Sequence, residues 1–249
     1  MTSKLSVTRI KCDIGASDLL PTGNNETAIH ILTGRCSTVV RDRCGERIHR
    51  NLGGRQNIFT QLPTTIFIGP ESEFKLVTET HCDILVAKYE READTYCPTV
   101  VMRPADVQVH NLGEGTHART VREIAAAGFP HFKIRLGETV NTVGGWSSWP
   151  VHAGEVAAQG FEEVFTYFCN PPTGFGIQVY DDPAMSTTAT ARKTTLVRSG
   201  DAFAIPQGFH PVVAAPDTQL MYVWIHASED GFGKEYARMA DESAGLYKI

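Results

Sequence analysis

The stretch that decides the fold begins as GGWSSWPVH at residues 144–152, continues as FEEVFTYF at 161–168 and ends as PQGFHP at 206–211. Glycine and proline separate short runs of aromatic and β-branched residues, which is typical of strands joined by tight turns. If these pieces are neighbouring strands of one small barrel, the side chains of His152, Glu163 and His210 converge on its axis. The stretch therefore predicts an all-β fold with a metal site in its interior.

The direction of the side chains around Glu163 supports this prediction. In a strand, Glu163, Phe165 and Tyr167 share one face. An ionised glutamate beside two aromatic rings on an inward face is costly unless it is paired or bound to a metal. Imidazole and carboxylate ligands suit zinc, manganese or iron. The alternative for His152 and His210 is that each only binds backbone groups of its own turn.

The same strand rhythm extends over most of the chain. The expected strands of the first half are residues 6–11, 28–33, 37–41, 57–61, 64–68, 73–78 and 84–89, and those of the second half are 132–140, 163–169, 175–180, 194–197, 202–205 and 219–226. Two series of six or seven short strands predict two tandem, jelly-roll-like β-barrel domains.

Between the two series the pattern changes. Residues 116–127 place apolar side chains at helical spacing, and Thr120 to Glu123 resembles a capping box, so a short helix is expected there. We therefore expect an N-terminal barrel over residues 1–110, a connector with a short helix over 111–130, and a C-terminal barrel with the metal site over 131–249.

Composition restricts the partners. The 249 residues include 23 lysines and arginines and 28 aspartates and glutamates, a formal charge of -5. Because these charges form no long runs, we expect a small-molecule ligand rather than nucleic acid or a membrane surface. No signal-peptide segment begins the chain, and no run approaches the roughly 18 apolar residues that span a bilayer, so we expect a soluble, cytoplasmic protein. A homodimer is compatible with long antiparallel edges in the first barrel.

The quoted segments resemble a known family. GWSSWP before His152, EEV at 162–164, Gln178 and PQGFHPV at 206–212 are similar to the 5-deoxy-glucuronate isomerases of myo-inositol catabolism, which are related to the 4-deoxy-L-threo-5-hexosulose-uronate isomerases. In the first half, LTGRC at 32–36 also fits. The resemblance covers most of the chain up to about residue 225 and does not include the tail after His226.

The resemblance implies a bicupin, two cupin barrels in tandem with the metal in the second. It also implies an aldose–ketose isomerase that converts 5-deoxy-glucuronate to 2-deoxy-5-keto-gluconate. His152, Glu163 and His210 correspond to metal ligands. Glu155 or a water at the metal is the candidate base of the proton transfer, and Tyr167 and Gln178 are candidates for orienting substrate hydroxyls.

The chain departs from the family pattern at two positions. Gly154 stands where the family has a second histidine, and Val179 stands where an arginine follows Gln178. The first departure reduces the ligands to two histidines and one carboxylate, unless Glu155, one residue further along, takes the place of the missing histidine. The second means that another cation must meet the substrate carboxylate, or that the substrate differs.

Two alternatives follow from these departures. A divergent, catalytically impaired cupin that binds a sugar or acts in regulation is favoured by Gly154. A bicupin dioxygenase with an iron triad fits the ligand set but not the Trp-Ser-Ser motif.

Overall fold

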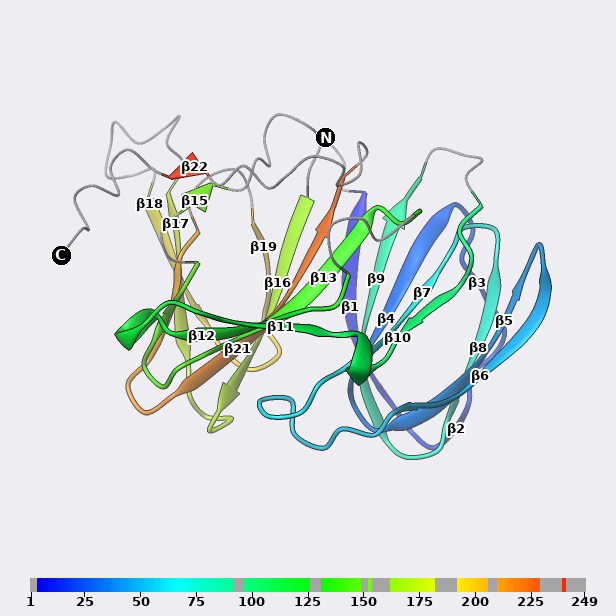
Figure 1. Cartoon of the computed structure of the whole chain (residues 1–249), viewed down its shortest axis with the longest axis horizontal. Coiled ribbons are helices and arrows are strands. Elements are labelled where there is room, and N and C mark those ends of the chain that lie inside the picture. Colours follow the sequence, from blue (N-terminus) through cyan, green and yellow to red (C-terminus); the bar gives the residue numbers. More distant parts are fainter. Residues whose placement is uncertain are drawn as a thin grey trace. The chain divides into compact units, whose positions relative to one another are not determined.

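The computed structural model describes residues 4–91, 96–125, 131–148, 152–153, 162–181, 192–205, 210–228 and 239–240. Over these residues the regular elements are strands and two single-turn 3-10 helices, η1 (Pro104–Asp106) and η2 (Gly115–His117), which confirms the all-β fold class. Among them there is also no helix that is long and apolar enough to cross a membrane. The chain divides into two compact units, one of Met1–Gln108 with Ile124–Arg135 and the other of Val109–Glu123 with Leu136–Ile249 (Figure 1).

The first unit is a pair of packed antiparallel sheets. In pairing order, the strands of its first sheet are β1 (Leu5–Cys12), β9 (Cys82–Glu90), β4 (Asn25–Thr33), β7 (Thr64–Ile68) and β10 (Val100–Met102). Those of its second sheet are β2 (Gly15–Ala16), β8 (Glu73–Thr78), β5 (Arg35–Asp42) and β6 (Gly45–Gly53), with β3 (Leu20–Pro21) also on β8. Both sheets contribute to one core, which contains Ile29, Ile31, Cys36, Val40, Leu52, Ile66, Ile68, Phe74, Leu76, Cys82 and Ile84.

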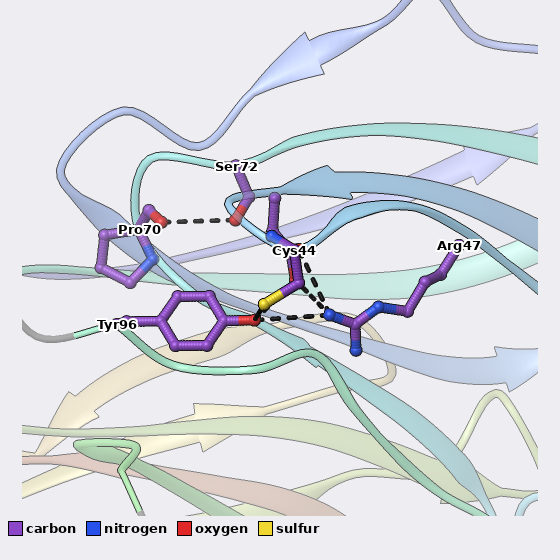
Figure 2. Close-up of polar contacts among 6 residues, drawn as sticks. Cys44, Arg47, Pro70, Ser72 and Tyr96 are labelled. Carbon is purple, nitrogen blue, oxygen red and sulfur yellow. Dashed lines mark hydrogen bonds and ion pairs between the residues drawn. The ribbon is translucent and has the colours of Figure 1, made fainter.

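A polar cluster fixes the hairpin formed by β5 and β6 (Figure 2). The Tyr96 hydroxyl donates to the Cys44 thiol at 3.0 Å, and Arg47 donates to the Tyr96 oxygen at 3.4 Å. In the turn before β8, the Ser72 hydroxyl donates to the carbonyl of Pro70 at 3.3 Å. Tyr96 is thus bonded to Cys44 in the turn between β5 and β6 and to Arg47 of β6, while Ser72 is bonded within its own turn.

The second unit is also a pair of packed sheets. Its first sheet contains β11 (Gln108–Leu112), β12 (Arg119–Glu123), β13 (Ile134–Asn141), β21 (Gln219–Ala227), β16 (Glu162–Asn170) and β19 (Ala202–Ile205). Its second contains β14 (Trp146–Ser147), β20 (Val212–Ala214), β17 (Gly176–Asp181) and β18 (Arg192–Val197), and β15 (His152–Ala153) pairs with β22 (Met239–Ala240). The core between the two larger sheets contains Phe165, Tyr167, Cys169, Val197, Ile205, Val212, Ala214, Leu220 and Tyr222.

The helix predicted over residues 116–127 is wrong. Residues 119–123 form β12, which pairs with β13 so that Val121 lies opposite Thr139. The β-branched Thr120 and Val121 favour an extended backbone, and an adjacent strand gives that backbone hydrogen-bond partners. The neighbouring sheet therefore decides the conformation of this segment, rather than its apolar spacing.

The strand predicted at residues 57–61 is also wrong, because this segment is a turn. The side-chain oxygen of Asn57 accepts the backbone N–H of Phe59, and that of Gln61 accepts the N–H groups of Gln56 and Asn57. Such local side-chain bonds compete with strand pairing. The hairpin partner of β5 is instead the polar segment β6.

Candidate active site

The candidate site begins with the pairing of β16 and β21. Glu163 lies opposite His226, Phe165 opposite Trp224, and Tyr167 opposite Tyr222. Directly opposed residues of an antiparallel pair lie on the same face of the sheet. Because Phe165, Tyr167 and Tyr222 belong to the core between the sheets, this is the inward face. Glu163 and His226 therefore project into the interior of the second unit.

The carboxylate of Glu163 lies between two imidazoles. His226 Nε2 is 2.6 Å from Glu163 Oε1, and His210 Nε2 is 3.7 Å from Glu163 Oε2. The exposed fractions of Glu163, His210 and His226 are only 5%, 2% and 9%. With water largely excluded, electrostatic interactions among these groups are stronger than at the surface.

Aromatic rings enclose this cluster. The ring of Phe165 meets His210 edge-on with centroids 5.6 Å apart, and the ring of Trp224 lies 5.0 Å from that of His226. Phe165 in turn packs on Tyr222 at 4.5 Å. The cluster is thus a polar centre in an apolar wall, which is the usual composition of a small-molecule site.

The donor atoms of Glu163 and His210 fit a shared divalent ion. Two atoms bound to one ion at about 2.1 Å lie roughly 3.0 to 3.4 Å apart, which is close to the 3.7 Å between Oε2 and Nε2. The 2.6 Å from His226 to Oε1 is shorter than that spacing and is a hydrogen bond. No group of three or more His, Cys, Asp or Glu side chains in the described part of the chain is placed to hold a metal ion. The described residues therefore offer two ligand atoms, Glu163 Oε2 and His210 Nε2.

The remaining predicted ligand and base fall at the limits of the described residues. His152 opens β15, where it is paired with Ala240 of β22. The side chain of His152, together with Gly154 and Glu155, lies outside the described residues. Of the three predicted metal ligands, the structure thus brings together Glu163 and His210.

Tyr167 and Gln178 form a hydrogen-bonded chain that ends at His210. The Tyr167 hydroxyl donates to Gln178 Oε1 at 2.7 Å, and Gln178 Nε2 donates to the backbone carbonyl of His210 at 2.8 Å. Burial is the main cause that raises the pKa of Tyr167 well above its usual range, and the nearby Tyr222 and Glu163 add to it. The hydroxyl therefore keeps its proton and remains a donor, and the chain holds the segment that carries His210.

The Trp-Ser-Ser segment also contacts this interior. Ser147 on β14 lies opposite Val212 of β20, directly after the His210–Pro211 segment. Its hydroxyl is 2.7 Å from the hydroxyl of Tyr222 on the inward face of β21. The motif thus connects the two sheets on either side of the candidate site.

Sequence reasoning missed His226. Alternation over residues 219–226 already places Leu220, Tyr222, Trp224 and His226 on one face. That alternation does not say which strand lies beside it, and only the register of β16 and β21 brings His226 to Glu163.

The family match decides the identity of the fold and the class of protein. Residues 2–243 match the model of the KduI/IolB family. The chain belongs to the KduI/IolB family. Relatives named 5-deoxy-glucuronate isomerase include one from Geobacillus thermodenitrificans, 26% identical over 210 residues that cover 82% of this chain and 73% of the relative. Another, from Listeria monocytogenes serovar 1/2a, is 30% identical over 200 residues that cover 77% of this chain and 69% of the relative. This member of the KduI/IolB family is therefore an enzyme of the isomerase class.

Solved structures confirm the cupin architecture. An IolB-like protein from Salmonella typhimurium LT2 is similar with a TM-score of 0.85 at 21% identity, covering 98% of this chain and 90% of that one. The oxalate decarboxylase of Lactobacillus farciminis is similar with a TM-score of 0.68 at 12% identity, covering 92% of this chain and 78% of that one. At these identities the likeness shows the fold, and it confirms the predicted bicupin.

Proposed function

We propose that this KduI/IolB family member is a metal-dependent aldose–ketose isomerase that converts 5-deoxy-glucuronate to 2-deoxy-5-keto-gluconate in myo-inositol catabolism. The observation that carries the proposal is the buried pair of Glu163 and His210, with donor atoms 3.7 Å apart inside an aromatic wall. The names of the relatives supply the substrate, a small sugar acid.

The metal would be held by Glu163 Oε2 and His210 Nε2 together with His152. Such a set of two imidazoles and one carboxylate suits zinc, manganese or iron. A related fold supports manganese as one candidate, because the oxalate decarboxylase of Bacillus subtilis, with a TM-score of 0.65, has Mn(II) centres. When bound, the ion would polarise the substrate carbonyl and stabilise the negative charge that develops during proton transfer.

The residues of the chain would supply orientation and exclusion of water. Aldose–ketose isomerisation through an enediol moves a proton between adjacent carbons, and exclusion of water strengthens the interactions that stabilise the negative charge developing during this transfer. Phe165, Trp224 and Tyr222 surround the polar centre and restrict water. Glu155 remains the proposed base from the sequence. Because Val179 replaces the expected arginine, the carboxylate of the substrate requires a cation from another position.

The test is an isomerase assay of the purified protein with 5-deoxy-glucuronate and added Mn²⁺, Zn²⁺ or Fe²⁺. We expect turnover with at least one ion, and we expect Glu163→Gln to lower kcat/KM by about 1,000-fold because it removes the charged ligand. Glu162→Gln is the matched control. Glu162 is the preceding residue of β16, so its side chain is on the opposite face, and the change should alter kcat/KM by less than about 2-fold.

Three outcomes would contradict the proposal. Absence of turnover with every ion would refute the activity, and equal activity of Glu163→Gln would refute the site. Turnover of 4-deoxy-L-threo-5-hexosulose-uronate in place of 5-deoxy-glucuronate would assign the other substrate of the related isomerases.

A further inference from the structure

The two oxygens of Glu163 have different surroundings. Oε1 is 2.6 Å from His226 Nε2, whereas Oε2 is the oxygen nearer to His210 Nε2, at 3.7 Å. The side chains of all three residues are almost fully buried. A buried carboxylate with one oxygen in a short hydrogen bond has little freedom to rotate, so the contact with His226 determines where Oε2 points.

We infer that His226 is a positioning residue for Glu163. Its Nε2–H donates to Oε1 and thereby keeps Oε2 turned toward His210. The role of Oε2 as a ligand rests on the proposed function, whereas the hydrogen bond between His226 and Glu163 does not. A partner of this kind, which binds a ligand rather than the ion, orients the ligand and raises its affinity for metal.

The competing role for His226 is that of a direct ligand, in place of the imidazole that is missing at Gly154. The geometry favours positioning. Two ligand atoms of one ion at about 2.1 Å cannot approach much closer than about 2.8 Å, because they would repel each other without a proton between them. The 2.6 Å between Nε2 and Oε1 therefore requires a shared proton, which an imidazole bound to metal through the same nitrogen does not have.

The packing around His226 holds its imidazole in this position. The ring of Trp224 lies 5.0 Å away at an interplanar angle of 34°. Trp224 itself rests on Gly137 of β13, where a Cβ atom would lie only 2.1 Å from Cζ2 of the indole. Gly137 therefore makes room for the indole, the indole supports the imidazole, and the imidazole orients the carboxylate.

The glycine at position 154 suggests why the orientation of Glu163 would matter for metal affinity. With glycine at the position of the family's second histidine, the site has one protein ligand fewer. A carboxylate already held in the binding orientation loses less conformational freedom when the ion arrives. Positioning of Glu163 by His226 would thus offset part of the affinity that a missing ligand costs.

The test compares His226→Gln with His226→Leu. The side-chain amide of glutamine places an N–H close to the position of imidazole Nε2, whereas leucine fills the space without a donor. Mn²⁺ affinity is measured by electron paramagnetic resonance of the free ion, and Zn²⁺ affinity by competition with a chelator. We expect His226→Leu to weaken binding about 10- to 100-fold and His226→Gln to stay within about 3-fold of the wild type, with one ion bound at saturation in both. In turnover, kcat should fall in His226→Leu while KM for the sugar acid stays unchanged.

Two results would overturn the inference. Wild-type affinity in folded His226→Leu would show that the hydrogen bond positions nothing. Loss of the bound ion in both variants, even at saturating metal, would show that His226 is itself a ligand.

A metal-free measurement separates this inference from the proposed function. In the apo protein with 15N-labelled histidine, the imidazole Nε2–H of His226 should give a downfield, slowly exchanging proton signal that disappears in Glu163→Leu. If the wild-type protein binds no ion, the proposed function is refuted. The proton signal still tests the hydrogen bond between His226 and Glu163 in that case. Absence of the signal in the wild type, or its persistence in Glu163→Leu, refutes the inference.

Discussion

Each of the two units buries a histidine in its interior, but the neighbours of the two imidazoles differ. In the first unit, His30 of β4 has Nδ1 2.8 Å from the Thr65 hydroxyl and Nε2 3.3 Å from Arg55 Nη2. In the second unit, His210 Nε2 is 3.7 Å from the carboxylate of Glu163. The two units are built alike, but the imidazole of the first lies beside a cation and that of the second lies beside an anion.

The sign of the neighbouring charge decides what each interior can bind. Arginine is permanently protonated and can only donate, so His30 Nε2 accepts from Arg55 and Nδ1 carries the proton that goes to Thr65. The guanidinium also donates through Nε to the carbonyl of Leu32 at 2.6 Å. A fixed positive charge beside Nε2 repels a divalent cation, whereas a carboxylate beside His210 attracts one. The first interior is therefore unfavourable for a cation, whereas the second is compatible with the proposed metal ion.

The largest expected effect comes from exchanging each buried histidine for alanine. His210→Ala should lower kcat by about 1,000-fold or more and abolish metal binding, because it removes a ligand. His30→Ala should leave kcat unchanged but reduce the free energy of unfolding by about 2 to 4 kcal/mol, because it creates a cavity and removes the acceptor of Arg55 Nη2 and the donor to the Thr65 hydroxyl. Steady-state kinetics, metal analysis and urea denaturation of the two variants check the contrast. A comparable loss of kcat in both would contradict the division of roles.

The two units also differ in the surroundings of a buried carboxylate, Glu26 in the first unit and Glu163 in the second. Glu26 is fully buried like Glu163, but its oxygens accept the backbone N–H groups of Lys133 and Ile134, and Oε2 is 3.3 Å from Arg91 Nη1. Burial is the largest effect on this group and raises the pKa of Glu26 from 4.5 to about 7, against the opposing effect of the N–H groups and of Arg91. The oxygens of Glu26 thus accept hydrogen bonds that hold the start of β13 in place.

A pH dependence of stability follows from this pKa. Because the folded state holds the proton of Glu26 more tightly than the unfolded chain does, the associated stability is complete below pH 4.5 and is lost as the pH rises to about 7. Between pH 5 and 8, the wild type should lose about 2 to 3 kcal/mol more unfolding free energy than Glu26→Gln. Urea denaturation at several pH values measures the two slopes. The exposed Glu90→Gln serves as the control and should keep the wild-type slope, while identical slopes for wild type and Glu26→Gln would refute the prediction.

Much of the fold can be predicted from the sequence where a strand's own residues determine it. Apolar alternation bounded by turn residues predicts strands at 64–68, 73–78 and 202–205, and the structure has those bounds. Strand β6 has mostly polar and exposed residues, and Val121 of β12 stands at helical spacing from Ile124 and Ala125, which follow the strand. Neither can be recognised without its neighbour, because their conformation comes from pairing.

In the candidate site too, residues whose position depends on strand pairing cannot be recognised from the sequence. The resemblance of the quoted segments to the family singles out His152, Glu163 and His210 as candidate ligands, which residue types and turns alone leave open. His226 depends on the register of two strands that lie 63 residues apart at this point in the chain, and that register is a property of the folded sheet. Sequence reasoning therefore finds the proposed ligands and misses His226, the residue that we propose orients one of them.

The smallest expected effect comes from removing the buried hydroxyl that supports each histidine, Tyr167 for His210 and Thr65 for His30. Tyr167→Phe removes the hydroxyl that donates to Gln178, and Gln178 holds the backbone of His210. We expect about a 10-fold loss of kcat, because His210 is held less firmly relative to Glu163. Thr65→Val removes the hydroxyl beside His30 with little change in shape, and we expect a loss of about 1 to 2 kcal/mol in unfolding free energy with kcat unchanged.

Kinetics and denaturation of both variants measure this difference. Since each substitution deletes one buried hydroxyl, unequal effects on kcat at similar losses of stability would show that the hydroxyl of the second unit acts on the position of His210. Equal and small effects on kcat would show that the chain from Tyr167 to His210 contributes only to stability, as the bond between Thr65 and His30 does.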